Sequence, residues 1–169
     1  MRPPEPDADP GSDPDTGQVV VRPATVADLP AVSRVHLASR AAAPMPPSVH
    51  DDSEHLPFLI GRLEAGEELW VAEDDGDPGG VVAYVRLTDT WLDDLYVAPH
   101  RAGQGLGSML LDLAKARRPS GFSLWVFESN APARAFYARH GLLEREHTDG
   151  AENEEHEPDL RMEWPGATA

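Results

Sequence analysis

The chain has 169 residues, of which 40% are hydrophobic, and a formal net charge of −16 at pH 7. This length suits one domain with a sizeable core, and no run of about 18 apolar residues predicts a membrane span. The acidity argues against a nucleic-acid partner, whose phosphates would be repelled; it is compatible with a cationic substrate such as an amine, or with solubility alone. Cysteine is absent, which excludes disulfides, thiolate nucleophiles and cysteine-based zinc sites, and no histidine spacing typical of a metal site occurs.

The N-terminal segment differs from the rest of the chain. Residues 1–17 carry five prolines and five acids among few apolar groups. Such a segment cannot bury enough surface to offset its ordering entropy, so we expect an acidic, proline-rich disordered tail. It lacks the apolar core of a secretion signal, and the expected compartment is therefore the cytoplasm. A single domain is predicted over residues 18–169.

Apolar periodicity then predicts alternating strands and helices. A first strand over residues 18–22 leads into a helix capped by Thr25, with Asp28 three residues on as in a capping box. His36, on the sheet-facing side of this helix, is interpreted as packing. Prolines interrupt the chain before a second helix at residues 51–65. The later elements are strands at 68–73, 80–87, 90–97, 122–127, 142–147 and 160–164, and helices starting at residues 106 and 130.

These elements predict an α/β fold with a mixed, mostly antiparallel seven-stranded sheet and about four helices. The hairpin of the second and third strands and the strand that follows are expected to be antiparallel neighbours. The fifth strand follows a helical crossover and should run parallel to the fourth.

A glycine-rich loop lies between the fourth strand and its helix. Gly103, Gly105 and Gly107 occupy every second position after Pro99, which ends the strand. Such a turn at a helix start leaves backbone N–H groups unpaired, and the helix dipole adds partial positive charge. Because glycine permits close approach of the backbone, the loop is suited to bind a phosphate or pyrophosphate.

Three interpretations of this loop compete. The glycines can serve packing alone. A dinucleotide fingerprint would use Glu128 as its acid, but Ser108 stands where the third glycine or alanine belongs. Thirdly, the strand ending in Val97-Ala98-Pro99, followed by Gly-x-Gly-x-Gly, resembles the acyl-CoA-binding signature of the GCN5-related N-acetyltransferase (GNAT) family. Ala102 stands where that family usually has Arg or Gln, and Arg101 precedes it.

A second stretch resembles the same family. Its pattern Asn-x-x-Ala-x-x-Phe-Tyr-x-x-x-Gly is matched by Asn130, Ala133, Phe136, Tyr137 and Gly141. The two signatures stand in the expected order and separation, and together they cover roughly residues 90–141. The resemblance implies the GNAT-type acyl-CoA N-acyltransferase fold.

The resemblance also implies a cofactor site for acetyl-CoA, in a notch where the fourth and fifth strands splay apart. Backbone groups of Leu95, Tyr96 and Val97 would bind the pantetheine arm and carbonyl, with the Val97 N–H as the oxyanion donor. Asn130 would bond the pantetheine amide or only cap its helix. The pyrophosphate would contact the loop, whose residues are Arg101, Ala102, Gly103, Gln104, Gly105, Leu106, Gly107 and Ser108.

Two residues are predicted to take part in proton transfer. Tyr137 matches the family's tyrosine near the thioester sulfur, where a phenol can protonate the departing thiolate; its alternative role is packing on Phe136. Asp93 is the first choice of base, because strand alternation places it on the face of Leu95 and Val97 and places Asp94 opposite. Glu73, Asp94 or a route to bulk water are the alternatives.

The predicted function is therefore acetyl-CoA-dependent N-acetylation of a primary amine, by direct attack in a ternary complex. The acceptor would be a small cationic molecule or a protein N-terminus. The alternative is a non-catalytic acyl-CoA-binding module of the same fold. No metal, nucleic acid or membrane is expected as a partner, whereas a homodimer is possible. The acidic loop at residues 148–159 is interpreted as solvated surface or as a metal or amine site. Family resemblance makes Met45, His50, His55 and Phe58 candidates for acceptor specificity, or else loop surface and local core.

Overall fold

A computed structural model describes residues 18–167. Its strands are β1 (Val19–Pro23), β2 (Glu68–Asp74), β3 (Val81–Leu87), β4 (Leu92–Val97), β5 (Phe122–Phe127), β6 (Leu143–His147) and β7 (Asp159–Trp164). Its α-helices are α1 (Leu29–Ala42), α2 (Asp52–Glu64), α3 (Leu106–Arg117) and α4 (Ala131–Arg139), and 3₁₀ turns lie at Val26–Asp28 and Pro99–Arg101. The predicted tail lies outside the described residues, and the extent of the domain stays a prediction.

Helix starts follow the capping signals of the sequence. Thr25 and Asp28 form the predicted capping box, in which the Asp28 carboxylate accepts from the Thr25 N–H at 2.7 Å. Asp51 caps α2 by accepting from the Ser53 N–H at 2.9 Å. Asn130 caps α4 by accepting from the Ala133 N–H at 3.3 Å. Each cap satisfies a donor that the first helical turn would otherwise leave free.

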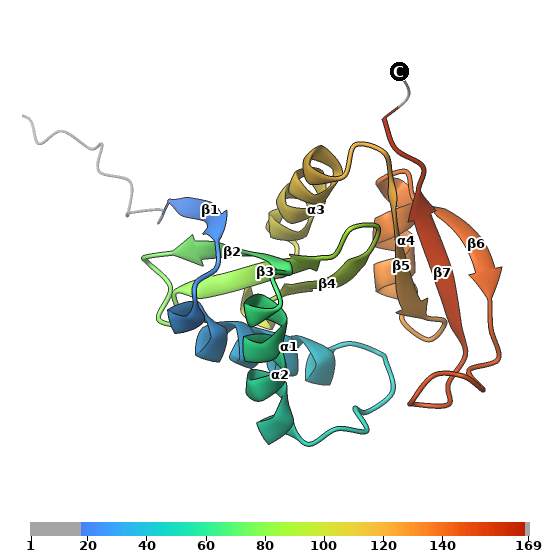
Figure 1. The fold of residues 1–169 in the computed structure, drawn as a ribbon, viewed down its shortest axis with the longest axis horizontal. Helices are drawn as coiled ribbons and strands as arrows, with labels where there is room; N and C mark the ends of the chain where they lie inside the picture. The colour runs from blue at the N-terminus through green and yellow to red at the C-terminus, as the bar shows by residue number, and fades with distance from the viewer. Residues whose placement is uncertain (1–17, 168–169) are drawn as a thin grey trace, which may run out of the picture.

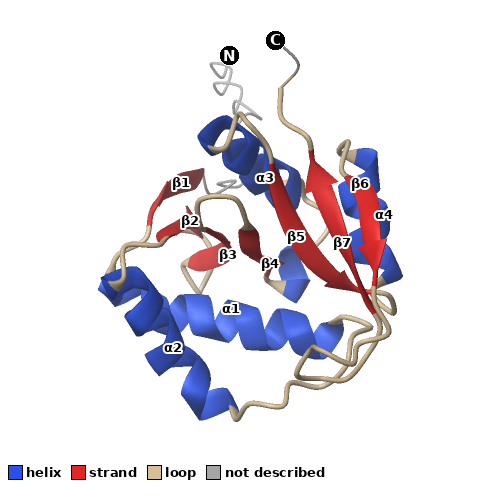
Figure 2. Cartoon of the chain, turned by 45° about the vertical axis from the view of Figure 1, so that its right-hand side comes forward, coloured by secondary structure: helices blue, strands red, loops and turns tan. Residues whose placement is uncertain are grey.

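The seven strands form two sheets. One has the order β1-β2-β3-β4 and the other β5-β7-β6, and all pairings within them are antiparallel. In the described chain, one parallel bridge between Trp91 and Ser123 links the sheets, supported by a 2.9 Å hydrogen bond from the Ser123 N–H to the Thr90 carbonyl. The bridge confirms that β5 runs parallel to β4. Beyond it the strands diverge, so the predicted seven-stranded sheet is divided in two (Figure 2).

Helices cover both faces of the four-stranded sheet (Figure 1). On one face α1 and α2 pack over a core that includes Leu29, Val32, Leu59, Val71 and Tyr84. On the other face α3 and α4 enclose a larger core with β5 and β7, including Leu106, Leu110, Leu124, Leu160 and Met162. No helix among residues 18–167 combines the length and apolar character needed to cross a membrane.

Candidate active site

A cleft of about 910 Å³ opens where β4 and β5 diverge. Its walls come from both edges of the gap, the C-terminal half of α1, the start of α4 and the loop between β6 and β7. Because the gap separates the two sheets, the cleft reaches both faces of β4. One half adjoins α3 and α4, and the other adjoins α1.

The edge of β4 presents backbone donors to this cleft. Ala98 N–H donates to the Val82 carbonyl at 2.8 Å, which fixes the alternation of the β3–β4 ladder. Leu95 and Val97 therefore direct their backbone polar groups away from β3 and towards β5. The Val97 carbonyl accepts from the Ser39 hydroxyl at 2.5 Å. In the described chain the N–H groups of Leu95 and Val97 have no acceptor, so both are available to a ligand.

Tyr96 differs from its two neighbours. The same alternation directs its backbone groups to β3, opposite Tyr84. Its ring packs 4.5 Å from the His36 ring on the α1 face. A backbone contact from Tyr96 to a cofactor stays a prediction that this geometry does not favour.

The glycine loop forms a cradle of free N–H groups. Gly103 and Gly105 have φ of 75° and 84°, and a Cβ added at either would meet nothing within 4 Å. Across residues 18–167, no acceptor pairs with the N–H groups of residues 103–108; the first paired N–H is that of Met109, which bonds the Gly105 carbonyl at 3.0 Å. Gly107 differs, since its Cβ would lie 3.4 Å from the Phe136 ring. It allows α3 to pack against α4.

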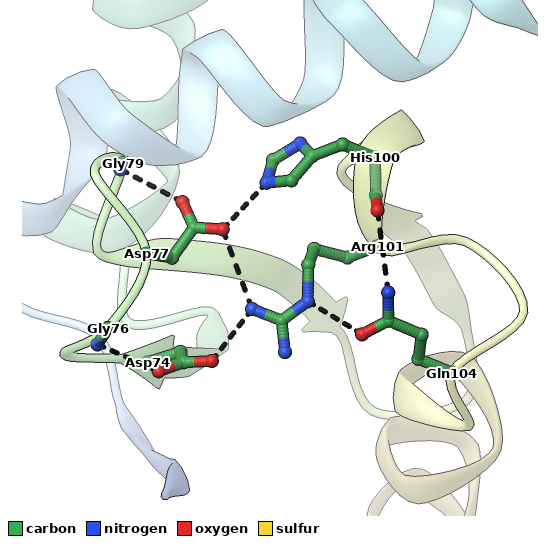
Figure 3. A network of polar contacts seen from close by, with 7 residues as sticks. All are labelled: Asp74, Gly76, Asp77, Gly79, His100, Arg101 and Gln104. Carbon is green, nitrogen blue, oxygen red and sulfur yellow. Dashed lines mark hydrogen bonds and ion pairs between the residues drawn. The ribbon is translucent and has the colours of Figure 1, made fainter. Parts of the chain in front are cut away.

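The Arg101 side chain points to the turn between β2 and β3 (Figure 3), and it is not among the residues that line the cleft. Its guanidinium lies 2.7 Å from the Asp74 carboxylate and donates to the Gln104 side chain at 2.8 Å. His100 also contacts this turn, because its Nε2 lies 2.6 Å from the Asp77 carboxylate. These bonds tie the glycine loop to the β2–β3 turn, and the bond from Arg101 lowers the pKa of Asp74. Of the predicted loop residues, Ala102 lines the cleft, whereas the side chains of Arg101 and Gln104 hold the loop in place.

A β-bulge in β4 changes the expected placement of Asp93. Arg86 pairs with Asp94 and Leu87 pairs with Leu92, so Asp93 is the extra residue. The Asp94 carboxylate accepts from Arg86 Nε at 2.5 Å, and Asp93 lies 3.9 Å from the same guanidinium. Asp93 therefore lies on the side of Asp94 and Arg86, and the prediction that it shares the face of Leu95 and Val97 is wrong.

Both aspartates nevertheless line the cleft. Asp94 is held by Arg86, which also donates to Glu67 at 2.6 Å. Asp93 accepts a 3.0 Å hydrogen bond from the Thr88 hydroxyl, and burial raises the pKa of its carboxyl. Glu73 pairs with Arg22 at 2.8 Å away from the cleft. The base assignment to Asp93 stays a prediction.

Tyr137 and Asn130 lie on the α4 side of the cleft. Tyr137 is buried and packs edge-on against Phe136 with ring centroids 5.2 Å apart. Its hydroxyl has no hydrogen-bond partner within residues 18–167, and burial raises its pKa. The phenol therefore keeps its proton at neutral pH and can donate it to a bound ligand.

His36 is a cleft residue that the sequence analysis assigned to packing. Its Nδ1 lies 2.7 Å from the Tyr84 hydroxyl, and its ring stacks on His55 at 3.8 Å. Tyr84 is fully buried, and its hydroxyl has no other partner among the described residues. A buried hydroxyl proton must be satisfied, so Tyr84 donates to Nδ1 and leaves the imidazole proton on Nε2. No sequence signal distinguishes this histidine from a packing residue.

The buried His36 predicts a pH-dependent stability. Burial lowers its pKa to about 4, against about 6.5 in the unfolded chain. Between these values the unfolded state binds more protons, so stability falls as the pH drops from 6.5 towards 4. We expect His36→Gln to remove roughly 1–2 kcal/mol of this fall, measured by urea unfolding at pH 7.5, 6.5, 5.5 and 4.5. If the free energy of unfolding fell equally with decreasing pH in the variant and the wild type, this role of His36 would be contradicted.

The half of the cleft next to α1 is acidic, and ion pairs connect the two segments at its rim. Arg40 pairs with Glu155 at 3.1 Å, and His50 pairs with Glu154 at 2.7 Å. These contacts join the segment after α1 to the acidic loop predicted at residues 148–159. Met45 lines the cleft, whereas His55 and Phe58 lie behind it on α2.

Several solved structures have a similar fold. The solution structure of apo-form YjaB from Escherichia coli matches with a TM-score of 0.66 and 20% identity, covering 89% of this chain and 99% of that one. A putative phosphinothricin N-acetyltransferase matches with a TM-score of 0.70 and 21% identity, covering 89% and 100%. The model of the acetyltransferase (GNAT) family matches residues 35–142, and the chain belongs to that family.

Two curated relatives are named as N-acetyltransferases. A probable N-acetyltransferase of Mycobacterium tuberculosis is 33% identical over 102 residues, covering 57% of this chain and 55% of that protein. The peptidyl-lysine N-acetyltransferase YjaB of Salmonella typhimurium is 38% identical over 87 residues, covering 52% and 58%. The chain thus spans little more than half the length of these two relatives.

Proposed function

We propose that the protein transfers the acetyl group of acetyl-CoA to a primary amine within a ternary complex. The observation that carries this proposal is the cleft between β4 and β5, which connects free backbone donors and the glycine loop with an acidic chamber. Family membership supports it, as do relatives named as N-acetyltransferases. A structural neighbour, YncA of Salmonella typhimurium, is described with its cofactor acetyl-CoA. Cytoplasmic location and a homodimer stay predictions.

In this proposal each wall of the cleft has a role. The pyrophosphate would accept from the N–H groups of residues 103–108, and the pantetheine arm would follow the edge of β4. The Val97 N–H would stabilise the charge that develops on the thioester oxygen. As the C–N bond forms and the C–S bond breaks, the amine would lose a proton to Asp93 or to water. Tyr137 would donate a proton or a hydrogen bond to the leaving sulfur.

The acceptor would be cationic and would enter through the acidic half of the cleft. The attacking amine must be neutral, so its ammonium form has to lose a proton near the reaction centre. Asp93 lines the same cleft, with a raised pKa and without a dedicated cationic partner. A small cationic amine therefore fits the chamber better than an anionic acceptor.

The first test is calorimetric titration with acetyl-CoA, followed by a thiol-release assay over a panel of primary amines. Binding with release of thiol on an amine would support acetyl transfer. Binding without release on any amine would favour the non-catalytic acyl-CoA-binding module. Absence of binding would contradict both functions.

Gly105→Ala is expected to weaken acetyl-CoA binding at least about tenfold. The added methyl group would stand in the open space where the pyrophosphate approaches, and a charge-assisted hydrogen bond is worth about 1.5–3 kcal/mol. Gly66 is a matched control, because it has φ of 86°, equally open surroundings and a place at the end of α2. Both alanine variants should lose about 1–2 kcal/mol of stability. Equal Kd values for acetyl-CoA in the two variants would contradict a phosphate-binding role of the loop.

A further inference from the structure

Trp125 is an exposed aromatic residue in the middle of β5. Its neighbours Leu124 and Val126 are buried in the core, so Trp125 projects from the opposite face of the strand. It retains 46% of its surface and lines the cleft. Its ring is stacked on Trp91, with centroids 6.3 Å apart and planes 11° apart. Trp91 therefore fixes the orientation of the Trp125 indole, which does not pack in the hydrophobic core.

The parallel bridge places Trp125 opposite the bulge of β4. Trp91 pairs with Ser123, and two residues further along each strand stand Asp93 and Trp125. Both line the cleft, on the side that faces α1. Along the strands, the level of Trp125 lies four residues before that of Val97, or three if the bulged residue adds no length, a separation of about 10–13 Å.

The walls of the cleft carry more carboxylates than cations, although Asp94, Glu154 and Glu155 are paired with Arg86, His50 and Arg40. The cleft walls contain six carboxylates, Asp93, Asp94, Glu152, Glu154, Glu155 and Asp159, against one guanidinium, Arg40. Arg40 is already bound by Glu155. The guanidinium nearest Asp93 is shared by Asp94 and Glu67, and Glu152 has no ion pair in the described chain. An aromatic face beside unpaired carboxylates attracts a cation and rejects an anion.

We propose that Trp125 is a specificity-determining residue which binds a second cationic group of the acceptor, so that the preferred acceptors are diamines. This inference rests on the proposed acetyl transfer. One nitrogen of the diamine would attack the thioester beside Val97, and the other ammonium would lie on the Trp125 indole. The separation of about 10–13 Å corresponds to an aliphatic chain of about eight carbons between the nitrogens.

The test compares two acceptors of equal length, 1,8-diaminooctane and 1-aminooctane, in the thiol-release assay. Wild-type protein should prefer the diamine in kcat/KM. Trp125→Leu, which keeps apolar bulk but removes the aromatic face, should lower the diamine-to-monoamine ratio about tenfold, mainly through KM. Trp125→Phe retains a ring and should keep most of the preference. Trp70→Leu, on β2 outside the cleft, controls for the loss of a tryptophan.

The possible outcomes distinguish failure of the diamine site from failure of acetyl transfer itself. Turnover of both amines at equal kcat/KM by the wild type would overturn the diamine site but leave acetyl transfer intact. An unchanged ratio in Trp125→Leu would also overturn the role of Trp125. Failure to acetylate any amine, despite binding of acetyl-CoA, would overturn the proposed function and the diamine site with it.

Discussion

Replacing Tyr137 by Phe is expected to lower kcat about 100-fold, since loss of one donor at a developing charge typically costs this much. The phenol is buried, and its hydroxyl has no hydrogen-bond partner in the part of the chain that the structure describes. Burial raises its pKa, so complete proton transfer to a thiolate is uphill and the hydroxyl acts chiefly as a hydrogen-bond donor to the leaving sulfur. In a site that excludes water such a bond strengthens as charge develops, and it therefore lowers the barrier rather than KM.

Phe preserves the edge-on packing on Phe136, so the variant should fold normally. Steady-state kinetics at saturating amine measure kcat, and calorimetry should give a Kd for acetyl-CoA within about twofold of the wild type, because the missing bond is made mainly in the transition state. A kcat close to that of the wild type would show that Tyr137 only orients the cofactor. A fall in affinity with unchanged kcat would assign it to binding.

Features determined by local sequence were predicted well. Gly103 and Gly105 adopt the left-handed conformation that a glycine-rich turn suggests, and Asn130 caps α4 as its spacing indicates. The strand at Phe122–Phe127 has the predicted bounds. Each of these depends on residues close in the chain, so periodicity and turn chemistry are sufficient to predict it.

Features that depend on distant partners were not predicted. The β4 bulge exists because Asp93 has no counterpart between Arg86 and Leu87, and strand alternation read from β4 alone assigned the aspartate to the wrong face. Arg101 is withdrawn from the cleft by Asp74, 27 residues away in the sequence. His36 enters the cleft because Tyr84, on a different element, anchors its ring. Such placements arise from tertiary pairing, which one sequence without a structure does not specify.

Arg86→Met should destabilise the fold by about 3–5 kcal/mol, the cost typical of removing one partner from a buried ion pair. Arg86 is 8% exposed and binds Asp94 at 2.5 Å and Glu67 at 2.6 Å, beneath the bulge of β4. Met fills a similar volume but leaves the Asp94 carboxylate, whose side chain is 11% exposed, without its cation, while Glu67 keeps only its 3.3 Å contact with Arg62. Urea unfolding at pH 7 measures the loss as a lower midpoint at unchanged m-value.

Arg145→Met is the matched control, because Arg145 pairs with Glu163 at 3.4 Å between side chains that are 39% and 32% exposed. An exposed pair of this kind is worth at most about 1 kcal/mol. Adding Asp94→Asn to Arg86→Met should recover part of the stability, since it removes the carboxylate charge that the first substitution leaves unpaired. If Arg86→Met cost no more than Arg145→Met, solvent would already reach the carboxylates beneath the bulge. The low-dielectric environment that raises the pKa of the neighbouring Asp93 would then be absent, and with it the physical reason for assigning the base to Asp93.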